Sequence, residues 1–115
     1  MTPNCLFCKI VQREIPAEIV LDHAHALAFK DIHPASPVHA LVIPKKHIAG
    51  ISQAEAEDVQ LLGQVLLAAK EVAHTLGIDE SGYRLVVNTG ADAKQSVLHL
   101  HVHVLGGRSL DWPPG

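Results

Sequence analysis

Residues 99–105 read HLHVHVL, an unbroken alternation of histidine with aliphatic residues that runs into Gly-Gly-Arg at 106–108. Successive side chains of a β-strand point to opposite faces. A strand over this stretch therefore places His99, His101 and His103 on one face and the aliphatic side chains on the other. The pattern predicts a strand with a buried apolar face and, opposite it, a row of three imidazoles at steps of about 6.5 to 7 Å.

Three interpretations of this imidazole row remain open from the spacing alone. The histidines can be ordinary solvated residues on the polar side of a strand. Imidazoles at positions i and i+2 can instead chelate zinc, with a third ligand from elsewhere and an open position for water. Alternatively, the central ring, His101, can attack phosphorus while its neighbours donate hydrogen bonds to charged oxygens. Three histidines in strict alternation favour a functional site over solvation.

The clearest helical pattern covers residues 52–76, where apolar residues recur at steps of three and four. The predicted start is a capping box between Ser52 and Glu55, in which each side chain accepts a hydrogen bond from the other residue's backbone N–H. The predicted end is Gly77, which can take the left-handed C-terminal conformation. The expected buried face consists of Val59, Leu62, Leu66, Ala69, Ala73 and Leu76.

Short apolar runs between turn signals predict a sheet around this helix. Strands are expected at residues 19–21, 27–29 and 40–43 before the helix and at 83–87 and 98–105 after it, with a loop over 88–96. A shorter helix is expected near residues 7–12. This order indicates an α+β domain in which the long helix packs on an antiparallel β-sheet of about five strands.

Length and composition predict one domain over residues 1–115, because hydrophobic residues make up 48% of the chain and suffice for a core without disulfides. One Trp, one Tyr and two Phe are too few to stack successive bases. The net charge is -3, and no basic run is longer than Lys45-Lys46. The sequence therefore shows no basic patch of the kind that binds extended nucleic acid or a membrane surface. No signal-peptide pattern or bilayer-spanning apolar run occurs, so a cytoplasmic protein is expected.

Cys5 and Cys8 form a C-x-x-C pair. In a reducing compartment this spacing indicates metal binding or redox chemistry before a structural disulfide. A redox pair is expected where an apolar strand meets a helix, and too few residues precede Cys5 to form that strand. Two thiolates at this spacing can hold one tetrahedral ion, provided that distant parts of the chain supply two more ligands. We therefore favour a metal site.

Beyond the histidine stretch, five other segments resemble a single family. They are FKDI at 29–32, PVHALVIPKKH at 37–47, VVNTG at 86–90, QSV at 95–97 and WPPG at 112–115. With residues 99–108 they occur in the same order as in the histidine triad (HIT) family, and most resemble its nucleotide-binding branch of purine nucleoside phosphoramidases. The resemblance implies the HIT-like fold, a homodimer, and cleavage of purine nucleoside phosphoramidates or related activated nucleoside monophosphates.

The resemblance also implies roles for residues around the histidine row. His101 corresponds to the nucleophile, which forms a covalent nucleotidyl-histidine that water or another acceptor then cleaves. His103 and Ser96 correspond to residues that contact the α-phosphate and the scissile bridging atom, where Ser96 can help to protonate a leaving amine. His39 corresponds to the remaining family histidine and supports the orientation of the site. No catalytic metal is required.

By the same resemblance, Asp31 binds the ribose hydroxyls, and Asn88 with the backbone around Lys94 and Gln95 meets ribose or phosphate. The residues that enclose the purine base in relatives can equally be core here: Phe7, Ile10, Ile15, Phe29 and Ile32. Lys94 departs from the family, which commonly has glycine at this position, and a lysine takes positive φ less readily. Either the loop has a different shape or an ammonium group lies near the phosphate.

For the metal site, analogy with bacterial members of the family and with galactose-1-phosphate uridylyltransferases adds His47 and His99 to Cys5 and Cys8. This implies a structural Zn2+ that joins the N-terminal segment to the histidine strand, in a closed Cys2His2 shell with no position for water. Two other functions stay open. One is a regulatory nucleotide-binding or protein-interaction module with incidental hydrolysis, and the other is a zinc hydrolase that uses the histidine row as its metal site.

Overall fold

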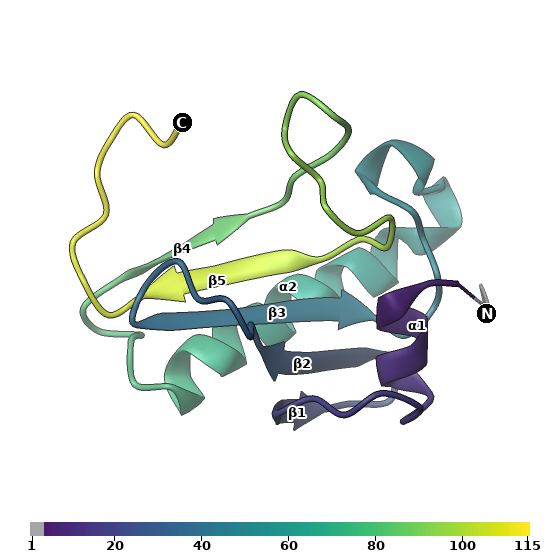
Figure 1. Ribbon diagram of the computed structural model, residues 1–115, viewed down its shortest axis with the longest axis horizontal. Coiled ribbons are helices and arrows are strands. Elements are labelled where there is room, and N and C mark those ends of the chain that lie inside the picture. The colour runs from purple at the N-terminus through teal and green to yellow at the C-terminus, as the bar shows by residue number, and fades with distance from the viewer. Residues whose placement is uncertain (1–3) are drawn as a thin grey trace.

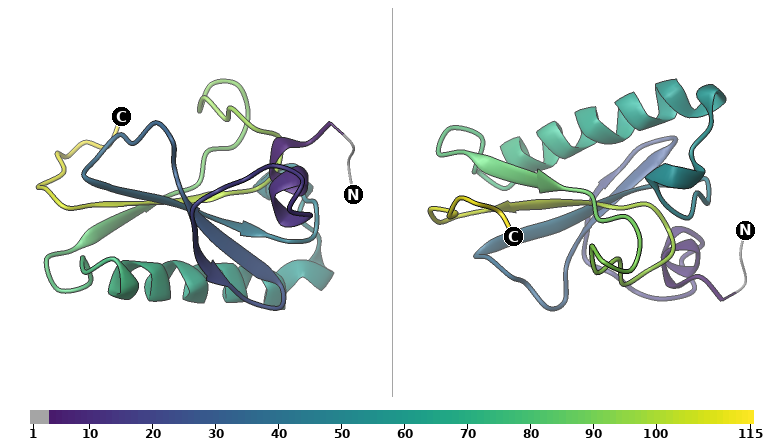
Figure 2. Two further views of the ribbon diagram at one scale, coloured as in Figure 1. Left: turned by 60° about the horizontal axis from the view of Figure 1, so that its bottom comes forward. Right: turned by 90° about the horizontal axis from the view of Figure 1, so that it is seen from above.

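A five-stranded antiparallel sheet organises the chain, whose computed structural model describes residues 4–115 (Figure 1). The strands are β1 (Ile19–Asp22), β2 (Ala26–Lys30), β3 (Val38–Pro44), β4 (Tyr83–Val86) and β5 (Val102–Gly106), in the spatial order β1-β2-β3-β5-β4. The helices α1 (Leu6–Val11) and α2 (Val59–Thr75) lie on opposite sides of the sheet (Figure 2). This confirms the expected α+β fold with one long helix and a short N-terminal helix.

The histidine stretch differs from its prediction at its start. Strand β5 begins at Val102, so of the three histidines only His103 lies within the strand. Continued pairing with β3 would bring the chain opposite Pro44, which has no N–H to donate. The N–H of Leu100 bonds instead to the carbonyl of Ile48, at 2.6 Å. The prediction of one continuous strand over 98–105 is therefore wrong for its first four residues.

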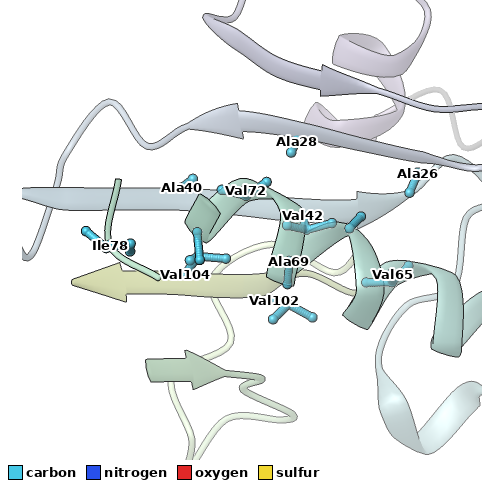
Figure 3. Close-up of a cluster of buried hydrophobic side chains, with 12 residues drawn as sticks. Ala26, Ala28, Ala40, Val42, Val65, Ala69, Val72, Ile78, Val102 and Val104 are labelled. Atoms are coloured by element: carbon cyan, nitrogen blue, oxygen red, sulfur yellow. The ribbon is translucent and has the colours of Figure 1, made fainter. Parts of the chain in front are cut away.

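Helix α2 covers one face of the sheet with small side chains (Figure 3). Its buried residues, which pack on aliphatic side chains of β2, β3 and β5, are Val65, Ala68, Ala69, Val72 and Ala73. The predicted buried face is wrong in its first half, because Val59 is 68% and Leu66 51% exposed. Apolar residues occur on most sides of α2. A spacing of three and four residues therefore fits two overlapping faces of the helix, and the spacing does not show which face is buried. The stripe of small residues is buried because it lets the helix approach the sheet closely.

The start of α2 also lies later than expected. Two short 3₁₀ turns, Ile51–Gln53 and Ala56–Asp58, precede the helix, which begins at Val59. The capping box predicted between Ser52 and Glu55 is wrong. The observed box joins Glu55 to Asp58, whose carboxylate accepts the Glu55 N–H at 2.8 Å.

Both ends of the helical segment have identifiable caps. The buried Asp58 carboxylate also accepts from Lys46 Nζ at 2.7 Å. The Lys46 bond first, and then the backbone bond from Glu55, hold the pKa of Asp58 below its ordinary value. At the other end, Gly77 has φ of 75°, which confirms the predicted C-terminal cap. No helix within residues 4–115 combines the length and apolarity needed to cross a bilayer.

Helix α1 packs on the second face of the sheet. Its buried side chains Phe7, Cys8 and Ile10 form a cluster with Leu27, Phe29, Leu41 and Ile43 of β2 and β3. The Phe7 ring also contacts the rings of His99 and His101. The histidines therefore lie on the α1 face, whereas the α2 face is aliphatic.

The capping arrangement predicts different effects for two substitutions. Asp58→Ala removes the cap and the partner of Lys46, so we expect the thermal unfolding midpoint to fall by about 4–8 °C. Ser52→Ala, at the position that the sequence pattern favoured, is expected to change the midpoint by no more than about 1 °C. Differential scanning calorimetry of both variants tests this. A larger loss from Ser52→Ala than from Asp58→Ala would contradict the observed helix start.

Candidate active site

The His101 imidazole is buried, and one of its two nitrogens is hydrogen-bonded to the backbone. Its Nδ1 lies 2.8 Å from the carbonyl oxygen of His99. A carbonyl can only accept, so Nδ1 carries the proton and the lone pair of the neutral ring is on Nε2. The Phe7 ring meets the His101 ring edge to face, with centroids 5.1 Å apart. The fold thus holds His101 in the tautomer that a nucleophilic Nε2 requires.

A chain of hydrogen bonds defines the tautomers of His39 and His103. The backbone N–H of Ala35 donates to His39 Nδ1 at 2.9 Å, so the proton of that neutral ring is on Nε2. His39 Nε2 lies 2.9 Å from His103 Nδ1, which must then accept. The remaining proton of His103 is on Nε2, a buried atom without a hydrogen-bond partner among residues 4–115. His103 therefore presents an unused N–H donor, and its ring centroid lies 5.0 Å from that of His101.

Burial keeps these rings neutral. Desolvation first, and then the neighbouring His101 and His39 rings, lower the pKa of His103 to about 4, against the opposing effect of the Asp31 carboxylate. Desolvation also lowers the pKa of His39, while the Asp31 carboxylate, 3.4 Å from His39 Nε2, acts in the opposite direction. The lowered pKa values of both rings therefore agree with the hydrogen bonds, which require one proton on each of His39 and His103.

The side chain of His99 turns to a second cluster, formed with Cys5, Cys8 and His47. His99 Nδ1 lies 3.4 Å from Cys5 Sγ, 3.5 Å from Cys8 Sγ and 3.2 Å from His47 Nδ1, and Cys8 Sγ lies 3.3 Å from His47 Nδ1. Around a tetrahedral ion with zinc-like bond lengths, such ligand atoms are separated by about 3.3 to 3.8 Å. The cluster can therefore hold a structural metal ion.

The protonation of His99 also suits a metal ligand. Its Nε2 lies 2.8 Å from the carbonyl oxygen of Pro44, so Nε2 carries the proton and Nδ1 offers its lone pair to the cluster. A carbonyl that accepts the second ring proton is the usual support of a ligating histidine. Desolvation first, with smaller effects of the His47 and His101 rings, lowers the pKa of His99 to about 4 despite the hydrogen bond to Pro44, which keeps the lone pair available at neutral pH.

Asp31, His39 and His103 also bring potential ligand atoms together. Here the hydrogen bonds oppose a metal ion. Binding through His39 Nε2 would move its proton to Nδ1, where it would face the N–H of Ala35. The same bonds suit a neutral relay from His39 to His103. The three histidines of the row do not converge on one point either, because His99 turns to the cysteines, so the geometry does not favour a zinc hydrolase built on the row.

The other residues that the sequence suggests for a nucleotide site differ in exposure. Asp31 is half-buried and its Oδ1 accepts the N–H of His33 at 2.8 Å. Ile32 is 84% exposed. Of the other four residues expected around the base, Phe7, Ile10 and Phe29 are buried in the core beneath α1 and Ile15 is half-buried beside it.

The loop after β4 is tied down by Gln95. Its Nε2 donates to the carbonyls of Ala49 at 2.7 Å and Val97 at 3.1 Å, and its Oε1 accepts the N–H of Gly90 at 3.0 Å. The Gln95 side chain therefore joins this loop to the segment around Ala49. Neighbouring Ser96 is exposed.

Lys94 takes the backbone conformation that a glycine would adopt freely. Its φ is 63°, and its N–H bonds to the Ala91 carbonyl at 3.0 Å in a turn. Lys94 therefore occupies the left-handed region although it is not a glycine. The Lys94 side chain is exposed and Asn88 is half-buried.

Sequence reasoning missed three groups that prepare the histidines: the Ala35 N–H, the Pro44 carbonyl and the Phe7 ring beside His101. The two backbone groups leave no trace in residue type, so no sequence signal reveals them. Phe7 carries a signal, since it lies inside the C-x-x-C pair and must lie near whatever that pair binds.

Comparisons with known proteins agree over nearly the whole chain. The HIT domain family matches residues 12–110. An uncharacterised HIT-like protein of Synechocystis sp. is 54% identical over 100% of both chains, and one of Synechococcus elongatus is 53% identical over the same coverage. A HIT family hydrolase from Legionella pneumophila superposes with a TM-score of 0.95 at 52% identity, over 97% of this chain and 100% of that chain. A histidine triad protein from Clostridium difficile gives 0.93 at 35% identity, over 96% of each.

The burial of His103 predicts its titration. Its pKa is lowered in the folded protein, so the neutral ring stabilises the fold above the unfolded value of about 6.5, and this contribution is lost as the pH falls towards 4. In ring-carbon NMR spectra, assigned by comparison with His103→Asn, we expect a midpoint near pH 4. In urea denaturation, the free energy of unfolding of the wild type should fall more between pH 7 and pH 5 than that of His103→Asn. A ring midpoint near 6.5 would contradict the buried, neutral His103.

Proposed function

This chain belongs to the HIT domain family, and on that premise we propose that it is a nucleotide hydrolase or transferase. Its substrates are purine nucleoside phosphoramidates or related activated nucleoside monophosphates, cleaved through a covalent nucleotidyl-histidine. One observation carries the proposal: His101 Nε2 offers a lone pair, and the neighbouring His103 ring has an Nε2–H without a hydrogen-bond partner among residues 4–115. A HIT family hydrolase from Legionella pneumophila, with a TM-score of 0.95, supports hydrolysis.

The reaction has two steps. His101 Nε2 attacks the α-phosphorus, the Nε2–P bond forms, and the P–N bond breaks with its electron pair on the leaving nitrogen. That nitrogen takes a proton from water, relayed through Ser96 or His103. The His99 carbonyl stabilises the cationic phosphorylated ring through its Nδ1–H. Water or another acceptor then attacks phosphorus and releases His101.

The nucleotide lies along the exposed rim of this centre. His103 donates its Nε2–H to the phosphate or the bridging atom, where charge develops. The remaining contacts are ribose hydroxyls on Asp31, base on Ile32, and ribose or phosphate on Asn88, on the backbone of Lys94 and Gln95, and on Ser96. The Gln95 side chain contributes only by fixing the loop, because its polar atoms bond to loop and neighbouring backbone groups.

The metal in the Cys5, Cys8, His47 and His99 cluster is proposed to be Zn2+. Two thiolates and two imidazoles are the donor set that zinc prefers, and the ligand-atom separations suit a tetrahedral ion. Four protein ligands leave no open position, so the ion is structural and the chemistry belongs to His101. Thiolate ligands fit a reducing compartment, which supports the cytoplasm as the location.

A homodimer is proposed through the edge of the sheet at β4. This strand is the last of the sheet, so one side of its backbone pairs with no other strand among residues 4–115. Exposed apolar side chains lie on the same strand and on α2, with Leu85 at 38%, Leu66 at 51% and Leu67 at 66% exposure. Pairing of two β4 strands would extend the sheet and cover part of this surface.

His101→Asn tests the nucleophile. We expect kcat for an adenosine phosphoramidate to fall by about 10³-fold or more, because no other residue supplies the attacking lone pair. Rapid quenching with substrate labelled at phosphorus should trap label on His101 in the wild type and none in the variant. His74→Asn, at an exposed histidine of α2, is the control and keeps both label and rate. Label on another residue would overturn the assignment.

Metal analysis tests the zinc. The purified protein should contain about one zinc per chain. Cys5→Ser should remove it and lower the thermal midpoint, because the ion joins α1 to the sheet. Exposed His23→Asn is the control and retains the metal. A wild-type chain that is folded and free of zinc after purification without chelators would exclude the site.

Two substitutions at Lys94 separate its charge from its backbone strain. Lys94→Gly and Lys94→Ala both remove the ammonium group. If Lys94 contacts the phosphate, both variants should have a higher KM than the wild type at low salt, and this increase in KM should be smaller at high salt. Only Lys94→Gly relieves the positive φ, and it should stabilise the fold by about 0.5–1 kcal/mol. An unchanged KM at both salt concentrations would remove Lys94 from the phosphate site.

A further inference from the structure

The backbone that carries His101 lies outside the hydrogen-bonded ladder of the sheet. Strand β5 begins only at Val102. Immediately before it, Leu100 N–H bonds to the Ile48 carbonyl and His99 Nε2 bonds to the Pro44 carbonyl. The other fixed group of this segment is His99 Nδ1, in the cluster with Cys5, Cys8 and His47. The nucleophile thus follows directly after a residue whose position depends on that cluster.

His99 connects the two sites through two different atoms. Its Nδ1 belongs to the metal-ligand cluster, and its carbonyl oxygen accepts the Nδ1–H of His101 at 2.8 Å. The side chain is fully buried and held on its other edge by Pro44, so the ring has little freedom. A movement of the His99 ring would therefore move the carbonyl that selects the His101 tautomer.

Phe7 provides a second connection. It lies between Cys5 and Cys8 in sequence, and its ring packs edge to face on His99 at 6.0 Å and on His101 at 5.1 Å between centroids. Ligation of both cysteines therefore fixes the first turn of α1 and, with it, the apolar wall beside the nucleophile. The connections through His99 and through Phe7 therefore both reach the His101 ring.

We propose that the ion held by Cys5, Cys8, His47 and His99 positions the nucleophile, with His99 as the positioning residue that transmits metal occupancy to the tautomer and orientation of His101. The catalytic consequence rests on the proposed function. Loss of the ion lets His99 and Phe7 relax, so His101 samples the other tautomer and other ring orientations. Because the groups that contact the nucleotide are elsewhere, kcat falls by about 10- to 100-fold and KM changes little.

The test compares two substitutions at His47, a ligand that has no contact with His101 among the interactions described above. His47→Asn removes a metal ligand, whereas His47→Cys keeps four ligands as a Cys3His set. Nitrogen-15 NMR of histidine-labelled protein at pH 8 reports the His101 tautomer, with assignment by His101→Asn. Zinc content and kcat are measured on the same samples. Val65→Ala, buried on the opposite face beneath α2, is the control for general loss of stability.

In the wild type and in His47→Cys, we expect bound zinc and a His101 ring protonated on Nδ1. In His47→Asn, zinc is lost, both tautomers are populated and kcat falls, while Val65→Ala keeps the zinc, the tautomer and kcat. A metal-free His47→Asn protein with the wild-type tautomer and kcat would overturn the proposal. So would a tautomer change of equal size in Val65→Ala.

A second measurement avoids any unfolding of the metal-free variant. Replacing zinc by the larger Cd2+ in the wild-type protein keeps the site filled but changes its bond lengths. The His101 nitrogen shifts should then change more than those of His39, and unchanged His101 shifts would overturn the proposal. These spectra need no substrate. A metal-sensitive tautomer in a protein without phosphoramidase activity would therefore contradict the proposed function while leaving the coupling in place.

Discussion

The hydrogen bond from His99 Nε2 to the Pro44 carbonyl, 2.8 Å long, connects the sheet to both halves of the site. Pro44 is the last residue of β3 and cannot donate to the neighbouring strand, so β5 pairs only from Val102 onward. The unpaired segment before β5 then turns the His99 ring towards the cysteines and its carbonyl towards His101. One proline at a strand end thus turns the His99 side chain towards the cysteines, away from the side chain of His101 two residues later.

The sequence was sufficient for the fold class and for most strand positions, because alternation and turn residues are local signals. It failed where the decisive partner is distant. The start of β5 depends on Pro44, and the buried face of α2 depends on where small residues meet the sheet, so Val59 and Leu66 were placed wrongly in the core. The helix start depends on Asp58, whose carboxylate is held by Lys46 from an earlier segment.

For the site, residue types predicted candidate side chains but not the hydrogen bonds that fix the protonation of each one. The four metal-cluster residues do lie together, yet spacing alone could not have selected His47 and His99 from nine histidines. The roles of the rings follow from which nitrogen holds the proton. That depends on the Ala35 N–H and on the carbonyls of Pro44 and His99. Every residue has a backbone carbonyl and every residue but proline a backbone N–H, so residue type does not reveal these partners.

Burial, more than any charge pair, sets the protonation of the His39 and His103 rings. Desolvation is the largest influence on the pKa of His39 and of His103, and the Asp31 carboxylate acts in the opposite direction. A site of neutral imidazoles has a good nucleophile and a hydrogen-bond donor but no strong acid at neutral pH. It cannot readily expel an alkoxide, which needs full protonation as it leaves. Under the proposed function, a phosphoramidate nitrogen is the better leaving group for such a site, because it is more basic and can take its proton from water through a weak donor.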